Sequence, residues 1–297
     1  MNTQSIVARA RRGARHSIRA VRSDNRVLSR YVFNARPLIR HRRRPPALSP
    51  EAVAVVTGLK QSGVMLTTAP ALLGDLELFD AIVAQTEELR AQPAVVDAAK
   101  PFLTELLGTN PALAPDDPLL RLALHPQIRG IAETYAGMSL RVQDVNIWVN
   151  RPVGDEPIQS QRWHRDLPED CDIVKCFVYL ADVPDGAGPL QYVRGTNTPE
   201  GRKIELPTEF DGIGHRLSDE DVTATFGEDA IVTGRGPAGT LVFADTRGIH
   251  RGGLALDTER VVGQITYGSQ ASTRPRNLRP APGVRRSDLR DLRLARA

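Results

Sequence analysis

The sequence changes its pattern at Gly137, and this change constrains the fold more than any other feature. Before Gly137, apolar residues recur at helical spacing after the Ser49–Pro50 cap, over residues 75–91 and on both sides of Pro126. After it, Gly, Pro and Asp separate six segments rich in β-branched and aromatic residues, at 139–150, 173–183, 189–195, 230–234, 239–245 and 261–268. Helices followed by many short strands predict a mainly β (α+β) domain, in which a barrel or double sheet carries flanking helices.

Positive charge is concentrated at the two ends of the chain. Residues 1–44 carry 13 Arg and a single acid, and residues 274–297 carry eight Arg and two Asp. Because the whole chain has a net charge of +4, this leaves residues 45–273 with a net charge of −14. Nucleic-acid binding requires a basic surface, so we predict that the central part of the chain does not have nucleic acid as a partner.

This distribution predicts three segments: a basic N-terminal arm (1–46), a domain (47–273) and a basic C-terminal tail (274–297). For the arm we expect a solvated or helical segment, with weak contact to an acidic membrane or another polyanion as one alternative and a mitochondrial presequence as another. No apolar run is long enough to span a bilayer, and no secretory signal follows Met1. The two cysteines exclude a disulfide scaffold, and the expected location is cytoplasmic.

Three residues of metal-binding types stand in a distinctive order. His164 and Asp166, within WHRD, are two positions apart and therefore project from one face of a strand. His250, within GIHRGG, follows 84 residues after Asp166 at another strand end. Two imidazoles and one carboxylate on adjacent strands occupy one face of an octahedral metal and leave three positions open, as in non-haem Fe(II) oxygenases. Zinc is more often held in a tetrahedral site with one open position.

Arg260 extends this pattern, because it follows His250 by ten residues at the start of RVVGQITYG. A fixed guanidinium binds a carboxylate through two parallel hydrogen bonds, as the far carboxylate of a metal-chelating 2-oxoglutarate requires. Lys175 and Asn146 are further candidates for contact with 2-oxoglutarate, since both are expected on the barrel face of their strands. The alternatives are a Lys175 that reaches solvent at a strand edge and an Asn146 that makes a structural hydrogen bond to the backbone.

Together these motifs resemble the phytanoyl-CoA dioxygenase family of Fe(II)/2-oxoglutarate-dependent oxygenases. The resemblance covers roughly residues 50–270 through HPQIRGIAETYAG, WHRD, VKCFVYLADVPDGAGPLQYVRGTN, GTLVFADTRGIHRGG and ERVVGQITYG, in the family's order. It implies a double-stranded β-helix, a cupin-like jelly roll, with His164, Asp166 and His250 as Fe(II) ligands and Arg260 as the partner of 2-oxoglutarate. The sequence departs from the family's usual Pro-Gly-Ser-His turn at Arg194 and Asn197, so we assign no role to that turn.

The function that the resemblance implies is hydroxylation of an unactivated C–H bond in a small-molecule or lipid-like substrate. O2 would be the other co-substrate, and succinate and CO2 the co-products. Desaturation or ring formation at the same centre is one alternative. A non-catalytic jelly-roll binding module is an alternative of a different class, which iron-dependent formation of succinate would distinguish. The sequence identifies neither the substrate nor the oligomeric state.

Overall fold

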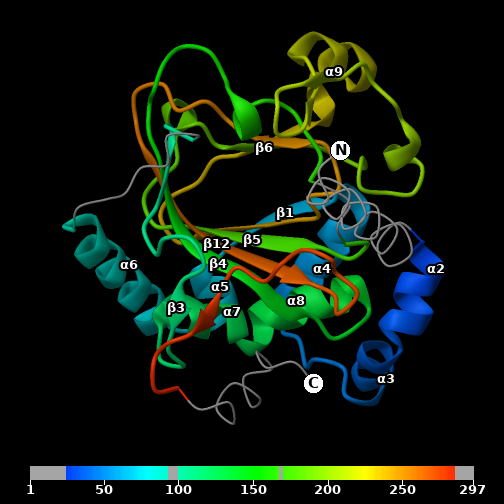
Figure 1. Ribbon diagram of the computed structural model, residues 1–297, viewed down its shortest axis with the longest axis vertical. Coiled ribbons are helices and arrows are strands. Elements are labelled where there is room, and N and C mark those ends of the chain that lie inside the picture. The colour runs from blue at the N-terminus through cyan, green and yellow to red at the C-terminus, as the bar shows by residue number, and fades with distance from the viewer. Residues whose placement is uncertain (1–24, 93–99, 167–169, 285–297) are drawn as a thin grey trace, which may run out of the picture.

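A six-stranded antiparallel sheet forms the centre of the protein (Figure 1). The computed structural model describes residues 25–92, 100–166 and 170–284. The strands of this larger sheet, in spatial order, are β1 (Val64–Thr68), β10 (Thr240–Ala244), β5 (Val174–Tyr179), β12 (Arg260–Gly268), β4 (Arg141–Asn150) and β2 (Leu103–Glu105). Neighbouring strands come from distant parts of the sequence, as the crossing connections of a jelly roll require.

A smaller sheet lies opposite the larger one. It contains β11 (His250–Gly252), β6 (Leu190–Val193) and β9 (Ile231–Gly234). Leu190 and Tyr192 of this sheet share an apolar cluster with Val64, Tyr179 and Val242 of the larger sheet, so the two sheets pack face to face. The predicted double-stranded β-helix is therefore confirmed. Two short pairs complete the β structure, β3 (Ala112–Leu113) with β13 (Arg279–Pro280) and β7 (Glu209–Phe210) with β8 (His215–Arg216).

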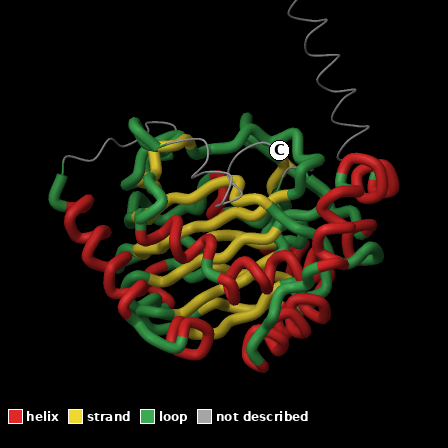
Figure 2. Tube along the Cα trace, turned by 90° about the horizontal axis from the view of Figure 1, so that it is seen from below, coloured by secondary structure: helices red, strands yellow, loops and turns green. Residues whose placement is uncertain are grey.

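Helices cover the outer face of the larger sheet, as the view from below shows (Figure 2). They are α4 (Pro50–Ser62), α5 (Ala69–Leu73), α6 (Glu77–Arg90), α7 (Pro118–Leu124) and α8 (Pro126–Ala136). The predicted cap is present at α4, where the Ser49 hydroxyl accepts a hydrogen bond from the Ala52 N–H at 3.2 Å. Gly63 and Gly137 end α4 and α8 in the left-handed conformation, which glycine adopts without strain.

The alternation of side chains along β4 separates the core from the barrel interior. Val145, Ile147 and Val149 pack into the cluster beneath the helices. Asn146 and Trp148 project to the opposite face, toward the interior between the sheets. The same alternation on β12 and β5 directs polar side chains into the interior. The predicted site residues of these strands lie there.

The described part of the N-terminal arm packs against this body. It consists of α2 (Arg26–Leu28), the π-helical turn η2 (Ser29–Phe33) and α3 (Ala35–Arg43). Leu38 is buried in the main core, the Arg30 guanidinium donates to the Ala136 carbonyl at 3.0 Å, and the Asn34 side chain accepts from the Ala271 N–H at 3.1 Å. Residues 1–24, where most of the expected membrane or polyanion contact falls, lie outside the described residues.

The basic tail also begins in contact with the domain. Asn277 donates to the Asp144 carboxylate at 3.0 Å, and Arg279 pairs with Ala112 across β13 and β3. Within the described ranges, none of the helices has the length and the apolar character needed to cross a membrane. One further α-helix, α9 (Asp219–Phe226), lies above the smaller sheet in Figure 1.

Candidate metal centre

His164, Asp166 and His250 come together at one edge of the smaller sheet. His164 pairs with His250 in an antiparallel bridge, and the Asp166 N–H donates to the Thr246 carbonyl at 2.9 Å. One potential ligand atom from each residue lies within 4.8 Å of the other two. The predicted two-residue spacing thus places His164 and Asp166 side by side, and β11 supplies the third donor.

Hydrogen bonds set the orientation of both imidazoles. Nδ1 of His164 lies 2.9 Å from the Arg162 carbonyl, and Nδ1 of His250 lies 2.9 Å from the Gly248 carbonyl. A carbonyl accepts only, so each Nδ1 carries the proton and each Nε2 keeps its lone pair. This arrangement is the usual support of a metal-binding histidine.

Burial keeps the two imidazoles neutral. It lowers the pKa of His164 to about 3, with the neighbouring His250 contributing, and it also lowers the pKa of His250. A metal ligand must have an available lone pair, so neutral rings are ready to bind at physiological pH. Two neutral nitrogens and one carboxylate suit a divalent transition metal such as Fe(II). The residues present therefore fit the expected metal.

Lys175 lies beside the carboxylate of the triad. Its Nζ is 2.6 Å from Oδ2 of Asp166, and the lysine is only 8% exposed. Burial alone would raise the pKa of Asp166, but the charge of Lys175 and its hydrogen bond hold it well below its ordinary value. Lys175 therefore does not reach solvent at a strand edge, and it keeps the Asp166 carboxylate ionised.

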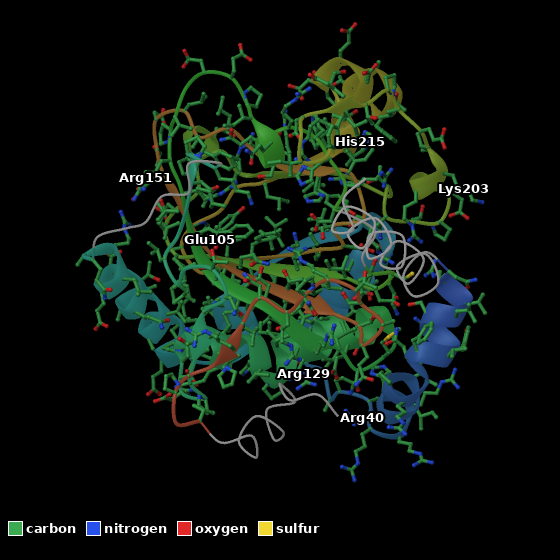
Figure 3. All side chains as sticks on the ribbon, in the orientation of Figure 1. Arg40, Glu105, Arg129, Arg151, Lys203 and His215 are labelled. Carbon is green, nitrogen blue, oxygen red and sulfur yellow. The ribbon has the colours of Figure 1, made fainter. Side chains whose placement is uncertain are left out.

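Asn146 faces the interior, but its amide bonds the turn after β2. Its Nδ2 donates to the Gly108 carbonyl at 3.0 Å and to Glu105 at 3.3 Å, while its Oδ1 accepts from the Leu107 N–H at 3.2 Å. Glu105, one of these two acceptors, is labelled in Figure 3. In this arrangement Asn146 makes structural hydrogen bonds to the backbone, which is the predicted alternative to contact with 2-oxoglutarate.

Arg260 lies at the start of β12 with its guanidinium buried near β11. Its Nη1 donates to the Gly188 carbonyl, and its Nε is buried without an acceptor among the described residues. A Cβ built on Gly252 would lie 2.9 Å from Nη2, so the guanidinium contacts the strand two residues beyond His250. The position is therefore compatible with binding a carboxylate that reaches into the barrel from the triad.

A large cleft opens beside the triad. Its volume is about 1340 Å³, and both His164 and Asp166 line it. His215, which Figure 3 labels near α9, also lines the cleft. The walls combine apolar residues from the 204–217 region, such as Ile204 and Leu206, with several arginines. A cleft of this size accommodates a small molecule next to the candidate metal ligands.

Two arginines inside the predicted motifs were not selected as site residues from the sequence. Arg165, between His164 and Asp166, donates to the carbonyls of Thr196 at 2.7 Å and Arg247 at 2.8 Å. Arg247 in turn forms a buried ion pair with Asp245, in which Nε lies 2.8 Å from Oδ1. Their position within the two metal-binding motifs is the signal that would have identified them.

The altered turn at 194–197 joins the same network. Asn197 donates to the Tyr135 hydroxyl at 2.9 Å, and Tyr135 donates to the Asp245 carboxylate at 2.7 Å. Arg194, in contrast, is exposed at the surface. Asn197 thus acts as a buried structural residue that connects the turn to α8.

Comparison with solved structures supports the fold. The epimerase SnoN in complex with Fe3+, alpha ketoglutarate and nogalamycin RO has a TM-score of 0.53 at 20% identity, over 74% of this chain and 84% of that chain. The non-heme alpha ketoglutarate dependent carbocyclase SnoK from nogalamycin biosynthesis has a TM-score of 0.51 at 23% identity, with the same coverage. EvdO2 from Micromonospora carbonacea var. aurantiaca gives 0.51 at 16% identity, over 73% and 90%. No protein-family model and no curated protein matches the sequence.

Proposed function

We propose that the protein is an Fe(II)/2-oxoglutarate-dependent dioxygenase that hydroxylates an unactivated C–H bond of a small-molecule substrate. The observation that carries this proposal is the triad of His164, Asp166 and His250, in which both rings present a free Nε2 toward one ionised carboxylate. The presence of Fe3+ and alpha ketoglutarate in the SnoN complex, a protein of the same fold, supports it. When bound, the iron would supply the oxidation chemistry, which no side chain of this chain provides.

The chain's own residues have three tasks in this function. His164, Asp166 and His250 would hold the metal at the wall of the cleft, which His164 and Asp166 line. Lys175 keeps the Asp166 carboxylate ionised and fixes its orientation. Arg260 offers buried guanidinium donors to the far carboxylate of 2-oxoglutarate, which would replace the Gly188 carbonyl as its partner.

The interior also limits the access of water. Phe177, Val242 and Val262 surround the polar positions of the larger sheet with apolar surface. Low water content strengthens the ion pair between Arg260 and an incoming carboxylate, since both charges are poorly screened there. Burial lowers the pKa of Arg260, although its guanidinium stays charged at physiological pH.

The test is an anaerobic titration of the metal-free full-length protein. Adding Fe(II) and then 2-oxoglutarate should produce the visible metal-to-ligand charge-transfer band of a chelated 2-oxoacid. Admitting O2 should then produce succinate in proportion to the iron. A protein that gives neither the band nor succinate is a non-catalytic binding module instead.

The reaction outcome is read from the product mass. Screening a metabolite pool with the iron-loaded enzyme should reveal a product that has gained one oxygen atom. Loss of two hydrogens from the substrate would instead show desaturation or ring formation. An unchanged mass with altered chromatographic mobility would show epimerisation.

A further inference from the structure

A cluster of arginines joins the large cleft to a smaller pocket of about 200 Å³. Arg26 of α2, Arg202 of the turn η5 (Gly201–Lys203) and Arg247 of the loop before β11 line both cavities. The smaller pocket adds Lys60 from the end of α4. Four cationic side chains from four separate elements therefore converge on one small, polar hollow.

The cations of this hollow exceed the carboxylates that face it. Within the described part of the chain, Asp172 is the one acid that lines the smaller pocket, and the charges of Arg247, Arg30 and Arg26 all act on its carboxylate. Asp245 is not among the residues that line the pocket, and it is paired with Arg247. Among the described residues, no carboxylate lies within ion-pair distance of Lys60, Arg26 or Arg202. The site therefore has an excess of positive charge that the described chain does not neutralise.

Two of the arginines carry further signs of an incomplete site. Nη1 of Arg247 is buried and has no acceptor among the described residues. Arg202 is about half buried, and its pKa is lowered by burial and then by the charges of Arg247 and Arg26. Holding like charges together in a partly desolvated place costs free energy, which a bound anion would offset.

This cluster is not a simple result of composition. Residues 45–273, which supply Lys60, Arg202 and Arg247, carry a net charge of −14. Of the residues that the structure describes, seven arginine and lysine residues nevertheless line the large cleft, against three carboxylates, one of which is Asp166 of the triad. Arg26 from the N-terminal arm and Arg274 from the C-terminal tail are among the seven, so both basic segments contribute to the cleft.

The cluster is physically connected to the metal triad. Arg165, between His164 and Asp166, donates to the Arg247 carbonyl at 2.8 Å and to the Gly201 carbonyl at 3.0 Å. The residue before Arg247, Thr246, accepts the Asp166 N–H. An anion bound at the arginines would therefore sit on the same rigid framework as the metal ligands, with the cleft leading from one to the other.

On this basis, and resting on the proposed oxygenase function, we propose that the substrate carries a phosphate group, which Arg26, Arg202 and Arg247 bind while the rest of the substrate occupies the cleft. A phosphate carries up to two negative charges and several acceptor oxygens, and arginine forks bind such oxygens in pairs. A single carboxylate offers one charge and two oxygens, fewer than this group of donors requires.

The first test is isothermal titration calorimetry of the metal-free full-length protein with inorganic pyrophosphate, inorganic phosphate and acetate. We expect one pyrophosphate site, and weaker binding of acetate than of phosphate. Arg202→Gln and Arg26→Gln should each weaken pyrophosphate binding by about tenfold or more, since each removes a charge-assisted contact. The matched control is Arg121→Gln, an exposed arginine on α7, which should bind pyrophosphate as the unmodified protein does.

Absence of pyrophosphate binding, or equal binding by Arg202→Gln, would overturn the proposal. Acetate binding as tight as phosphate binding would overturn the assignment of a phosphate. The titration with metal and 2-oxoglutarate, run on the same variants, keeps this proposal separate from the oxygenase function. If pyrophosphate binds but the metal or 2-oxoglutarate does not, the anion site stands and the oxygenase proposal fails.

Discussion

His164 and His250 exchange a pair of backbone hydrogen bonds, each N–H donating to the other's carbonyl at 2.9 Å. In an antiparallel ladder, such a pair places the two side chains next to each other on one face. The ring centroids accordingly lie 4.4 Å apart. The separation of the two imidazoles is thus set by main-chain geometry, so the candidate metal site is preorganised in the folded chain.

The first prediction concerns metal binding by these two rings. His164→Ala and His250→Ala should each abolish stoichiometric binding of Co(II), used as a substitute for Fe(II), because a site with two ligands loses most of its affinity. Metal content after dialysis measures the effect. His215→Ala is the control, since His215 is exposed and contacts Thr208. If all three variants keep their metal, the triad is not the site.

The second prediction concerns the part that α3 plays in stability. Leu38 is 6% exposed within the main core, whereas its neighbour Ile39 is 50% exposed. Leu38→Ala should therefore lower the free energy of unfolding by about 2–5 kcal/mol, and Ile39→Ala by about 0.5 kcal/mol or less. Urea unfolding of the two variants provides the comparison. Equal effects would mean that the arm does not pack on the domain.

The third prediction concerns the pH dependence that Asp170 contributes. Burial raises the pKa of Asp170 from 3.8 to about 6, although its side chain accepts hydrogen bonds from the Ser269 hydroxyl and N–H. The folded chain thus holds this proton at pH values where the unfolded chain has released it. The stability from this group is fully present below about pH 4 and is lost as the pH rises through about 6.

Asp170→Asn tests this, because asparagine does not titrate. The free energy of unfolding of the unmodified protein, minus that of the variant, should fall by up to about 3 kcal/mol as the pH rises from about 3 to about 7, and should then stay constant. Urea unfolding at a series of pH values measures it. A difference that does not change with pH would show that Asp170 has an ordinary pKa in the folded protein.

Local patterns in the sequence were sufficient to predict α4, α6, α7, α8 and the main strands, whereas α5 and α9 were not predicted. The cap at Ser49 and the stops at Gly63 and Gly137 act through neighbouring residues, so they are visible in sequence. The three-residue strand β2 has no pattern of its own, because it exists through pairing with β4. The packing of the arm was also not predicted, since one buried leucine among arginines leaves almost no periodicity.

The candidate site was likewise predicted only in part: residues with a local pattern could be identified, and contacts between distant segments could not. The sequence could identify His164, Asp166 and His250, because metal binding requires these residue types and they occur in a recognisable order. The ion pair between Lys175 and Asp166 could not be predicted, because it depends on the order of the strands in the folded sheet. The cluster of Arg26, Arg202 and Arg247, together with Lys60, could not be predicted either. These residues come from four segments that are far apart in the sequence, and only folding brings them together.

The last prediction concerns Arg260 as the anchor of 2-oxoglutarate. An unpaired carboxylate in a buried site costs several kcal/mol, so Arg260→Ala should weaken 2-oxoglutarate binding by on the order of 10²-fold, equivalent to about 3 kcal/mol. Arg260→Lys should restore part of this affinity, since lysine keeps the charge but lacks the planar fork. Metal content should not change, because Arg260 is not a ligand. The measurement is the charge-transfer titration under argon for each variant.

Pyruvate provides the internal control, because it chelates a metal through the same keto and carboxylate groups but lacks the far carboxylate. Its affinity should therefore be nearly the same in the unmodified protein and in Arg260→Ala. Equal loss for pyruvate and 2-oxoglutarate would indicate that the substitution disturbs the barrel, with Gly188 and Gly252, which contact the guanidinium, as the affected neighbours. If 2-oxoglutarate binds all variants equally, its carboxylate lies elsewhere, and Lys175 becomes the next cation in the interior to test.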